Sequence, residues 1–277
     1  MKFTSVLLLT VWVLLGGCRR SPDANAAAGS DRVVNFIMSD IGFNSEIVPA
    51  LKAEVAKRGF ELKWVVVNDI IQPNKMVDDG SADANSFQHE PYFDQFVKDH
   101  GLKNVTHGFY TIFTSSGLYS RKYKSLSQVP DGATFGVPVD PANNGRALFM
   151  LQEKGLLKLR PGVSVIHASL KDITDNPHHY KFKEVDQLML MRTIEDVDVG
   201  FLFSLYAIKT GFDPVKDALA YESADATPYL GMVAVRKDLV NTPKIKALQA
   251  AYASDAVKAV YRSHYGDAIV FLDDHNR

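Results

Sequence analysis

Apolar and polar positions along the chain follow two different periods. Short apolar runs are typical of buried strands, and stretches with apolar residues three or four positions apart are typical of helices. Strands are predicted at 33–38, 62–67, 82–87, 134–137, 163–167, 185–188, 199–203 and 229–235, and the stretch 106–119 is predicted to be extended and β-rich. Helices are predicted at 45–58 and 74–79, from Pro91 onward, at 146–154 and from 242 to about 261. This alternation predicts an α/β fold with largely parallel sheets.

The alternating units are long enough to form two lobes. A chain of 277 residues suits two domains. Two consecutive α/β units predict two lobes with a cleft between them, which is a common position for a ligand.

The first residues carry a different pattern. An apolar run at 6–15 follows Lys2 and is too short to span a bilayer, which takes about 20 residues. It is typical of a signal peptide. The sequence LGGC that ends at Cys18 resembles the bacterial lipobox, in which the cysteine is acylated and becomes the new N-terminus. The alternative is a signal peptide with an incidental cysteine.

We therefore predict a signal peptide at 1–17 and a lipidation site at Cys18. Residues 19–30 are small and polar without an apolar period, so 18–31 is predicted to be a lipidated flexible tether.

Composition and charge exclude several classes of function. The net charge is −1 and Lys and Arg form no long run, so nucleic acid is not an expected partner. Cys18 is the only cysteine, so we expect no disulfide, thiolate metal site or cysteine nucleophile in the folded part. His89 has no second ligand at a suitable spacing, and His178 and His179 lie in a polar stretch, so no metal and no cofactor are expected.

The sequence also lacks a convincing catalytic motif. There is no G-x-S-x-G motif, and no catalytic residues are predicted. The protein is therefore expected not to be an enzyme. The competing hypothesis is an enzyme that uses Asp140 or His89 as a base.

One stretch, VPVDPANNGRALFML, raises a question of charge. A short strand ends at Val139, turn-forming residues fill 140–145, and a helix is predicted to carry Arg146 in its first turn. A cation is unfavourable there, because helix N-termini already carry partial positive charge. Arg146 is therefore predicted to bind an anion. The alternatives are an arginine on the surface or one paired to an internal Asp.

Three stretches carry a family resemblance: GSADANSFQHEPYFDQFVKDHG, VPVDPANNGRALFMLQEKGLLKL and TPYLGMVAVRKD, in this order. From about 33 to 261 the chain resembles the NlpA/MetQ family of methionine-binding lipoproteins, which serve ABC transporters. The resemblance implies a type II periplasmic binding protein fold with two crossover strands, near 118–124 and 221–229. Lobe 1 is expected at 32–120 and 229–277, and lobe 2 at 121–228.

The resemblance also implies a ligand site. The family's arginine at the position of Arg146 binds the α-carboxylate of an amino acid, for which a guanidinium is a good two-pronged donor. Asn143 is expected to orient the loop or to bond the ligand. Phe87, His89 and Tyr92 match residues that form the side-chain pocket, where aromatic faces suit a thioether. Without the resemblance, these aromatic residues would suit ordinary packing.

The sequence departs from the family at three positions. Phe203 and Gly231 align with two asparagines that bond the ligand's head group, and Ile70 aligns with a tyrosine of the pocket wall. A hydrogen bond to a charged group contributes about 1.5–3 kcal/mol, so the loss of two costs roughly two to four decades of affinity. Gly231 is expected to leave a gap. We expect a small anionic ligand other than free methionine, such as an acid without a free amino group, a methionine derivative or a peptide.

The predicted function is that of a solute-binding lipoprotein. It is expected to deliver a small-molecule ligand, an amino acid or related anion, to an ABC permease and its ATPase, and to be a monomer. Its body would lie in the periplasm or on the outer face of the cytoplasmic membrane, with only the N-terminal lipid in the membrane. The alternative is an envelope lipoprotein with a sensing or structural role and no transport function.

Overall fold

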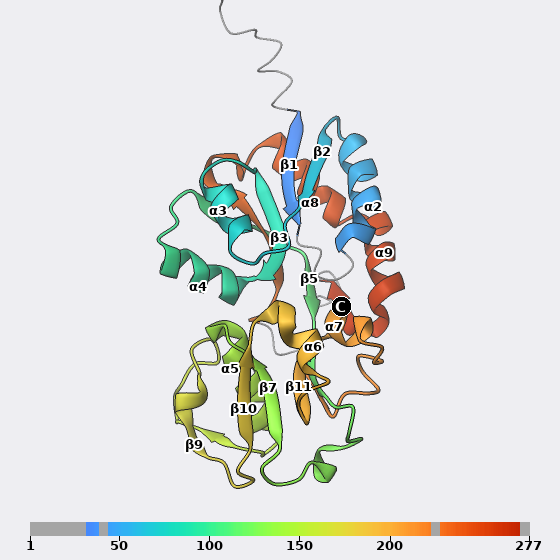
Figure 1. The fold of residues 1–277 in the computed structure, drawn as a ribbon. Coiled ribbons are helices and arrows are strands. Elements are labelled where there is room, and N and C mark those ends of the chain that lie inside the picture. Colours follow the sequence, from blue (N-terminus) through green and yellow to red (C-terminus); the bar gives the residue numbers. More distant parts are fainter. Residues whose placement is uncertain (1–31, 39–43, 223–227, 272–277) are drawn as a thin grey trace, which may run out of the picture.

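Two α/β lobes, each built on a five-stranded sheet, make up the folded part (Figure 1). The computed structural model describes residues 32–38, 44–222 and 228–271. The predicted signal peptide, Cys18 and the tether lie outside these residues. No helix in the described part is both long and apolar enough to cross a bilayer.

The sheet of the first lobe has the order β2-β1-β3-β13-β4. Strand β1 pairs in parallel with β2 and β3, and β13 pairs antiparallel with β3 and β4. The bounds are β1 Val33–Met38, β2 Glu61–Val66, β3 Ala84–His89, β4 Val105–Tyr110 and β13 Gly231–Arg236.

The sheet of the second lobe has the order β10-β7-β11-β6-β12. Strand β7 pairs in parallel with β10 and β11, whereas β6 pairs antiparallel with β11 and β12. The bounds are β6 Ser116–Tyr119, β7 Thr134–Pro138, β10 Lys181–Val185, β11 Val199–Phe203 and β12 Ala220–Tyr221. The α/β fold and the largely parallel sheets are as predicted. In each sheet four strands run in the same direction. The fifth strand, β13 in the first sheet and β6 in the second, runs antiparallel to its neighbours and brings the chain in from the other lobe.

Helices cover both faces of the first sheet. Apolar residues of α2, α8 and α9 pack against one face, and those of α3 and α4 pack against the other. In the second lobe, α5, α6 and α7 contribute to one continuous core with β6, β7 and β11. The bounds are α2 Asn44–Ala56, α3 Gln72–Asp78, α4 Glu90–His100, α5 Pro141–Glu153, α6 Leu190–Thr193, α7 Ser204–Lys209, α8 Pro243–Tyr252 and α9 Asp255–Tyr265.

The remaining elements are short. Strand β5 pairs antiparallel with β14 at the junction of the lobes, and β8 pairs antiparallel with β9 in the second lobe. The bounds are β5 Ile112–Thr114, β14 Ile269–Phe271, β8 Lys158–Leu159 and β9 Ile173–Asp175, with short 3-10 turns at Leu126–Gln128, Leu170–Asp172, Gln187–Met189, Lys237–Leu239 and Gly266–Ala268.

The chain passes twice between the lobes. It leaves the first sheet through β4 and β5 and enters the second at β6, and it returns from β12 to β13. The lobe boundaries 32–120, 121–228 and 229–277 stay a prediction. Because β6 already pairs in the second sheet, we propose that the first boundary lies just before Ser116.

Two helix predictions were wrong in their bounds. Helix α5 begins at Pro141, so Arg146 lies in its second turn rather than its first. The Asp140 side chain accepts a hydrogen bond from the Asn143 backbone N–H, so the residues interpreted as a turn are an N-cap and a first turn. The single C-terminal helix is in fact two, because α8 ends at Tyr252 and Ser254 caps the next helix, α9.

Two strand predictions were wrong. The stretch 163–167 forms turns, in which the N–H groups of His167 and Ala168 bond the nearby carbonyl of Ser164. The stretch 185–188 begins where β10 ends and continues as a 3-10 turn. In both cases a short apolar run belongs to a partly buried turn. The hydrophobic period of so short a run does not distinguish such a turn from a strand.

Candidate ligand-binding site

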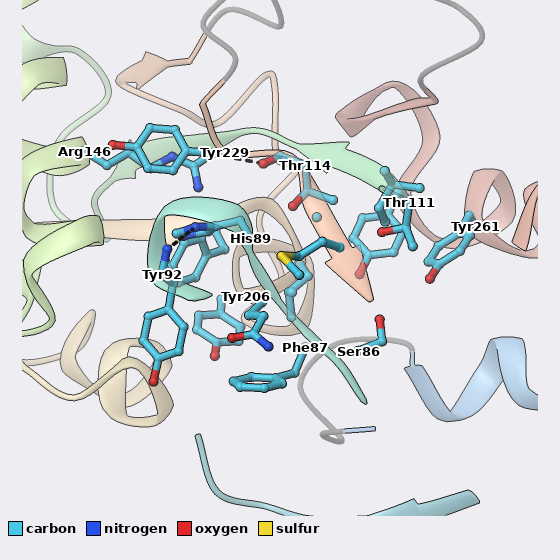
Figure 2. Close-up of a pocket in the computed structure, with 17 residues that line it drawn as sticks. Ser86, Phe87, His89, Tyr92, Thr111, Thr114, Arg146, Tyr206, Tyr229 and Tyr261 are labelled. Atoms are coloured by element: carbon cyan, nitrogen blue, oxygen red, sulfur yellow. Dashed lines mark hydrogen bonds between the residues drawn. The ribbon is translucent and has the colours of Figure 1, made fainter. Parts of the chain in front are cut away.

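A cavity lies between the two lobes and receives side chains from both. Its walls come from β3, α4 and β13 of the first lobe, from α5, β11 and α7 of the second, from β5 at the junction, and from α9. The lining is dominated by the aromatic residues Phe87, Tyr92, Phe203, Tyr206, Tyr229 and Tyr261. Figure 2 shows Arg146 and Tyr229 on one side of this space and Tyr261 on the other.

Six of the eight predicted ligand-site residues line this cavity. They are Phe87, His89, Tyr92, Arg146, Phe203 and Gly231. They come from positions as far apart as β3 and β13, so the fold brings together residues that the sequence only suggested as separate motifs.

Arg146 is buried and already has an anionic partner. Its side chain is 3% exposed, and its Nε donates to the two carboxylate oxygens of Glu222 at 2.9 and 3.2 Å. Its Nη2 donates to Glu222 as well, and to the backbone carbonyl of Thr114 at 3.1 Å. The carboxylate in contact with Arg146 is therefore supplied by the chain itself. Internal pairing was the alternative left open by the sequence, with Glu222 in place of an Asp.

Aromatic rings enclose the same guanidinium. Its central carbon lies 4.2 Å from the centre of the Tyr229 ring and 5.8 Å from that of Phe203. No described residue accepts a hydrogen bond from Nη1 of Arg146, and Arg146 lines the cavity. This nitrogen is therefore a candidate donor to a ligand.

His89 presents the face of its ring rather than a free nitrogen. It is the N-cap residue of α4, and its Nδ1 accepts a hydrogen bond from the Tyr92 backbone N–H at 3.2 Å. Its Nε2 therefore carries the proton and donates to Oδ1 of Asn143 at 2.8 Å. Burial, and then the charge of Arg146, lower the pKa of His89 to about 3.

Asn143 positions His89 and does not line the cavity. Its Oδ1 accepts from His89, and its Nδ2 donates to Oδ1 of Asp140 at 2.9 Å. Both ends of the amide are thus engaged inside the protein. Of the two roles expected for Asn143, orienting neighbouring groups is the one that this geometry supports.

A His89→Asn variant is expected to lose less stability in acid than the wild type. The unfolded chain takes up a proton on His89 below about pH 6.5, whereas the folded chain does so only near pH 3. His89 therefore destabilises the fold progressively as the pH falls from about 6.5 to 3, by about 1–2 kcal/mol at pH 5. Asparagine keeps the cap. Urea unfolding of both proteins at pH 7.5 and 5 measures this difference, and equal losses would contradict it.

Gly231 does not leave the gap that the sequence predicted. A Cβ at this position would lie 2.8 Å from the carbonyl oxygen of Ile112 and 3.1 Å from Oγ1 of Thr111. The Thr111 N–H donates to the Gly231 carbonyl at 2.8 Å and holds the start of β5 against β13. The space that a side chain at 231 would need is filled by the Ile112 carbonyl and the Thr111 side chain.

Ile70 does not line the cavity that contains Arg146. Its backbone carbonyl accepts a hydrogen bond from the Tyr92 hydroxyl at 3.1 Å. It lines a second hollow, which Tyr92 also lines, together with Phe96 and Asp140.

Sequence reasoning missed several residues of the cavity. Glu222 stands alone after β12 without a motif around it. Tyr261 and Tyr265 of α9 line the cavity and are separated by one helical turn, which was a usable signal. The buried hydroxyl of Tyr206 has no hydrogen-bond partner among the described residues. Within the described residues, no group of three or more metal-ligating side chains converges.

Comparison with known proteins decides the family. The profile of the NlpA lipoprotein family matches residues 41–271. The chain belongs to the NlpA lipoprotein family. A D-methionine-binding lipoprotein MetQ from Salmonella typhi is 39% identical over 210 residues, which cover 75% of this chain and 76% of the relative.

Solved structures of similar proteins support the same family and show its fold. A nutrient-binding protein from Burkholderia cenocepacia bound to methionine has a TM-score of 0.81 and 36% identity, over 86% of this chain and 99% of its own. A periplasmic substrate-binding protein of an ABC transporter from Coxiella burnetii has a TM-score of 0.80 and 34% identity, again over 86% and 99%. The predicted family and the type II periplasmic binding protein fold are confirmed. The NlpA lipoprotein family consists of substrate-binding lipoproteins rather than enzymes.

Proposed function

We propose that this NlpA family protein is the solute-binding lipoprotein of an ABC importer. It is anchored through Cys18, its body lies outside the cytoplasm, and its lobes close on a small methionine-like ligand. The observation that carries the proposal is the aromatic cavity between two lobes that are joined by two crossovers. Such an arrangement suits capture by hinge closure. Relatives described as methionine-binding and as ABC transporter proteins support it.

The ligand that we propose is a methionine derivative or a methionine-containing peptide rather than free methionine. The thioether would lie against the aromatic walls that include Phe87 and Tyr92. The head group of a free amino acid would meet the ring of Phe203 beside Arg146, where the family has an asparagine. Gly231 offers no side-chain amide either.

Native mass spectrometry of the purified protein tests the proposal directly. A co-purified small molecule of this class, together with stimulation of the ATPase of a cognate transporter by the loaded protein, is the expected result. A loaded protein that leaves every candidate transporter unstimulated would favour the alternative of an envelope lipoprotein without transport. Calorimetry with L-methionine is expected to give no sub-micromolar affinity, and such an affinity would contradict the proposed ligand.

A Phe203→Asn variant is expected to bind L-methionine at least tenfold more tightly than the wild type. The amide restores one hydrogen bond to a charged head group, which contributes about 1.5–3 kcal/mol. Phe203→Leu is the matched control, because it removes the ring without adding an amide. Calorimetry of the three proteins measures the change in affinity. An equal gain in affinity in the leucine variant would show that the space left by the ring, and not the amide, causes it.

A further inference from the structure

The hydroxyl of Tyr206 is a buried polar group in the wall of the cavity. Tyr206 lies in the first turn of α7, is 1% exposed, and is one of the residues that line the cavity (Figure 2). No described residue forms a hydrogen bond with its hydroxyl. A buried polar group without a partner is unfavourable, and in native proteins such a group calls for an explanation. The hydroxyl is therefore a candidate contact for a ligand.

This hydroxyl keeps its proton and lies in a region of negative charge. Burial raises the pKa of Tyr206 above its ordinary value, and the charges of Asp186 and Asp140 act in the same direction. The same charges would repel an anionic group of a ligand. A neutral oxygen on the ligand, in contrast, can accept a hydrogen bond from the phenol.

Tyr206 and Arg146 are close enough for one small ligand to contact both. The centre of the Phe203 ring lies 5.4 Å from that of Tyr206 and 5.8 Å from the guanidinium carbon of Arg146. A ligand whose acidic end binds Arg146 can therefore place its side chain at Tyr206. In the aromatic wall nearby, Phe87 has no donor and the Tyr92 hydroxyl already donates to a backbone carbonyl.

Resting on the proposed function, we propose that the Tyr206 hydroxyl determines the specificity of the side-chain pocket. It donates a hydrogen bond to an uncharged oxygen on the side chain of the ligand, which free methionine lacks. The methionine derivative with such an oxygen at the sulfur is the sulfoxide, whose side chain is polar and chiral. A single fixed hydroxyl meets the sulfur from one side, so the site prefers one of the two sulfoxide epimers.

Two probes that differ by one oxygen test the inference. N-acetyl-L-methionine carries a thioether and N-acetyl-L-methionine S-oxide a sulfoxide, and both keep the carboxylate for Arg146. Calorimetry of the full chain is expected to show that the wild type binds one sulfoxide epimer about tenfold more tightly than the thioether. Tyr206→Phe removes only the hydroxyl and is expected to abolish this preference.

A matched control removes a similar hydroxyl elsewhere. The hydroxyl of Tyr221 is also buried without a partner among the described residues, but Tyr221 is not one of those that line the cavity. Tyr221→Phe is therefore expected to keep the preference for the sulfoxide. Urea unfolding without ligand is a second measurement. Tyr206→Phe is expected to unfold at the same urea concentration as the wild type or a higher one, because it loses no hydrogen bond within the protein.

Several results would overturn the inference. They are a wild type that binds the thioether as tightly as either epimer, a wild type that binds neither probe, and a Tyr206→Phe variant that keeps the preference. A Tyr206→Phe protein that unfolds at a clearly lower urea concentration would show that the hydroxyl already has a partner. The wild-type comparison decides even where this variant fails to fold. The proposed function fails separately, when the purified protein carries no small molecule and stimulates no transporter.

Discussion

An Arg146→Met variant is expected to lose about 3–5 kcal/mol of unfolding free energy, because it leaves the Glu222 carboxylate buried without its partner. Methionine retains much of the apolar stem, so the loss reports mainly the missing charge and its hydrogen bonds. Urea denaturation near neutral pH measures the change. The effect is large because both side chains are almost fully shielded from water, which cannot replace the lost bonds.

Two further variants separate pairing from general disruption. The double variant Arg146→Met, Glu222→Gln is expected to recover much of the lost stability, since neither charge remains buried alone. Lys183→Ala removes one partner of the exposed ion pair with Asp196, and it is expected to change stability little. If Arg146→Met costs no more than Lys183→Ala, the buried pair does not stabilise the fold as we infer.

A Gly145→Ala variant is expected to lose at least about 3 kcal/mol and to weaken ligand binding. A Cβ at this position of α5 would lie 1.8 Å from the carbonyl oxygen of Val165, far inside any permitted contact. Either α5 or the turns at 163–168 must move, and overpacking of this kind is costly. Movement of α5 would also displace Arg146, which follows directly in the same helix.

Urea denaturation compares this variant with Glu153→Ala, a substitution at an exposed position of the same helix. The control side chain is 70% exposed, and its replacement is expected to have little effect. A Gly145→Ala protein as stable as this control would show that the turns at 163–168 yield freely to the helix, and that Gly145 is not required for close packing.

The sequence by itself determined those helices and strands for which the hydrophobic period and the capping residues predict the same element. The run of apolar residues in β11 is buried at every position, as its pattern predicts. Aromatic and polar residues around His89 and Arg146 were identified as one site, and most of them do line a single cavity. The prediction of helix bounds was wrong where the same residue types favour two structures. Asp140 and the residues after it suit a turn, but they also suit the start of a helix.

The tertiary structure alone decided which anion Arg146 contacts and what surrounds Gly231. Arg146 and Glu222 are 76 positions apart, and they meet only because α5 and the return crossover converge at the junction of the lobes. The carbonyl of Ile112 reaches Gly231 only because β5 is held against β13. The physical reason is the same in both cases. Periodicity and capping act within a few residues, whereas charge pairing and close packing depend on distances between segments that the fold brings together.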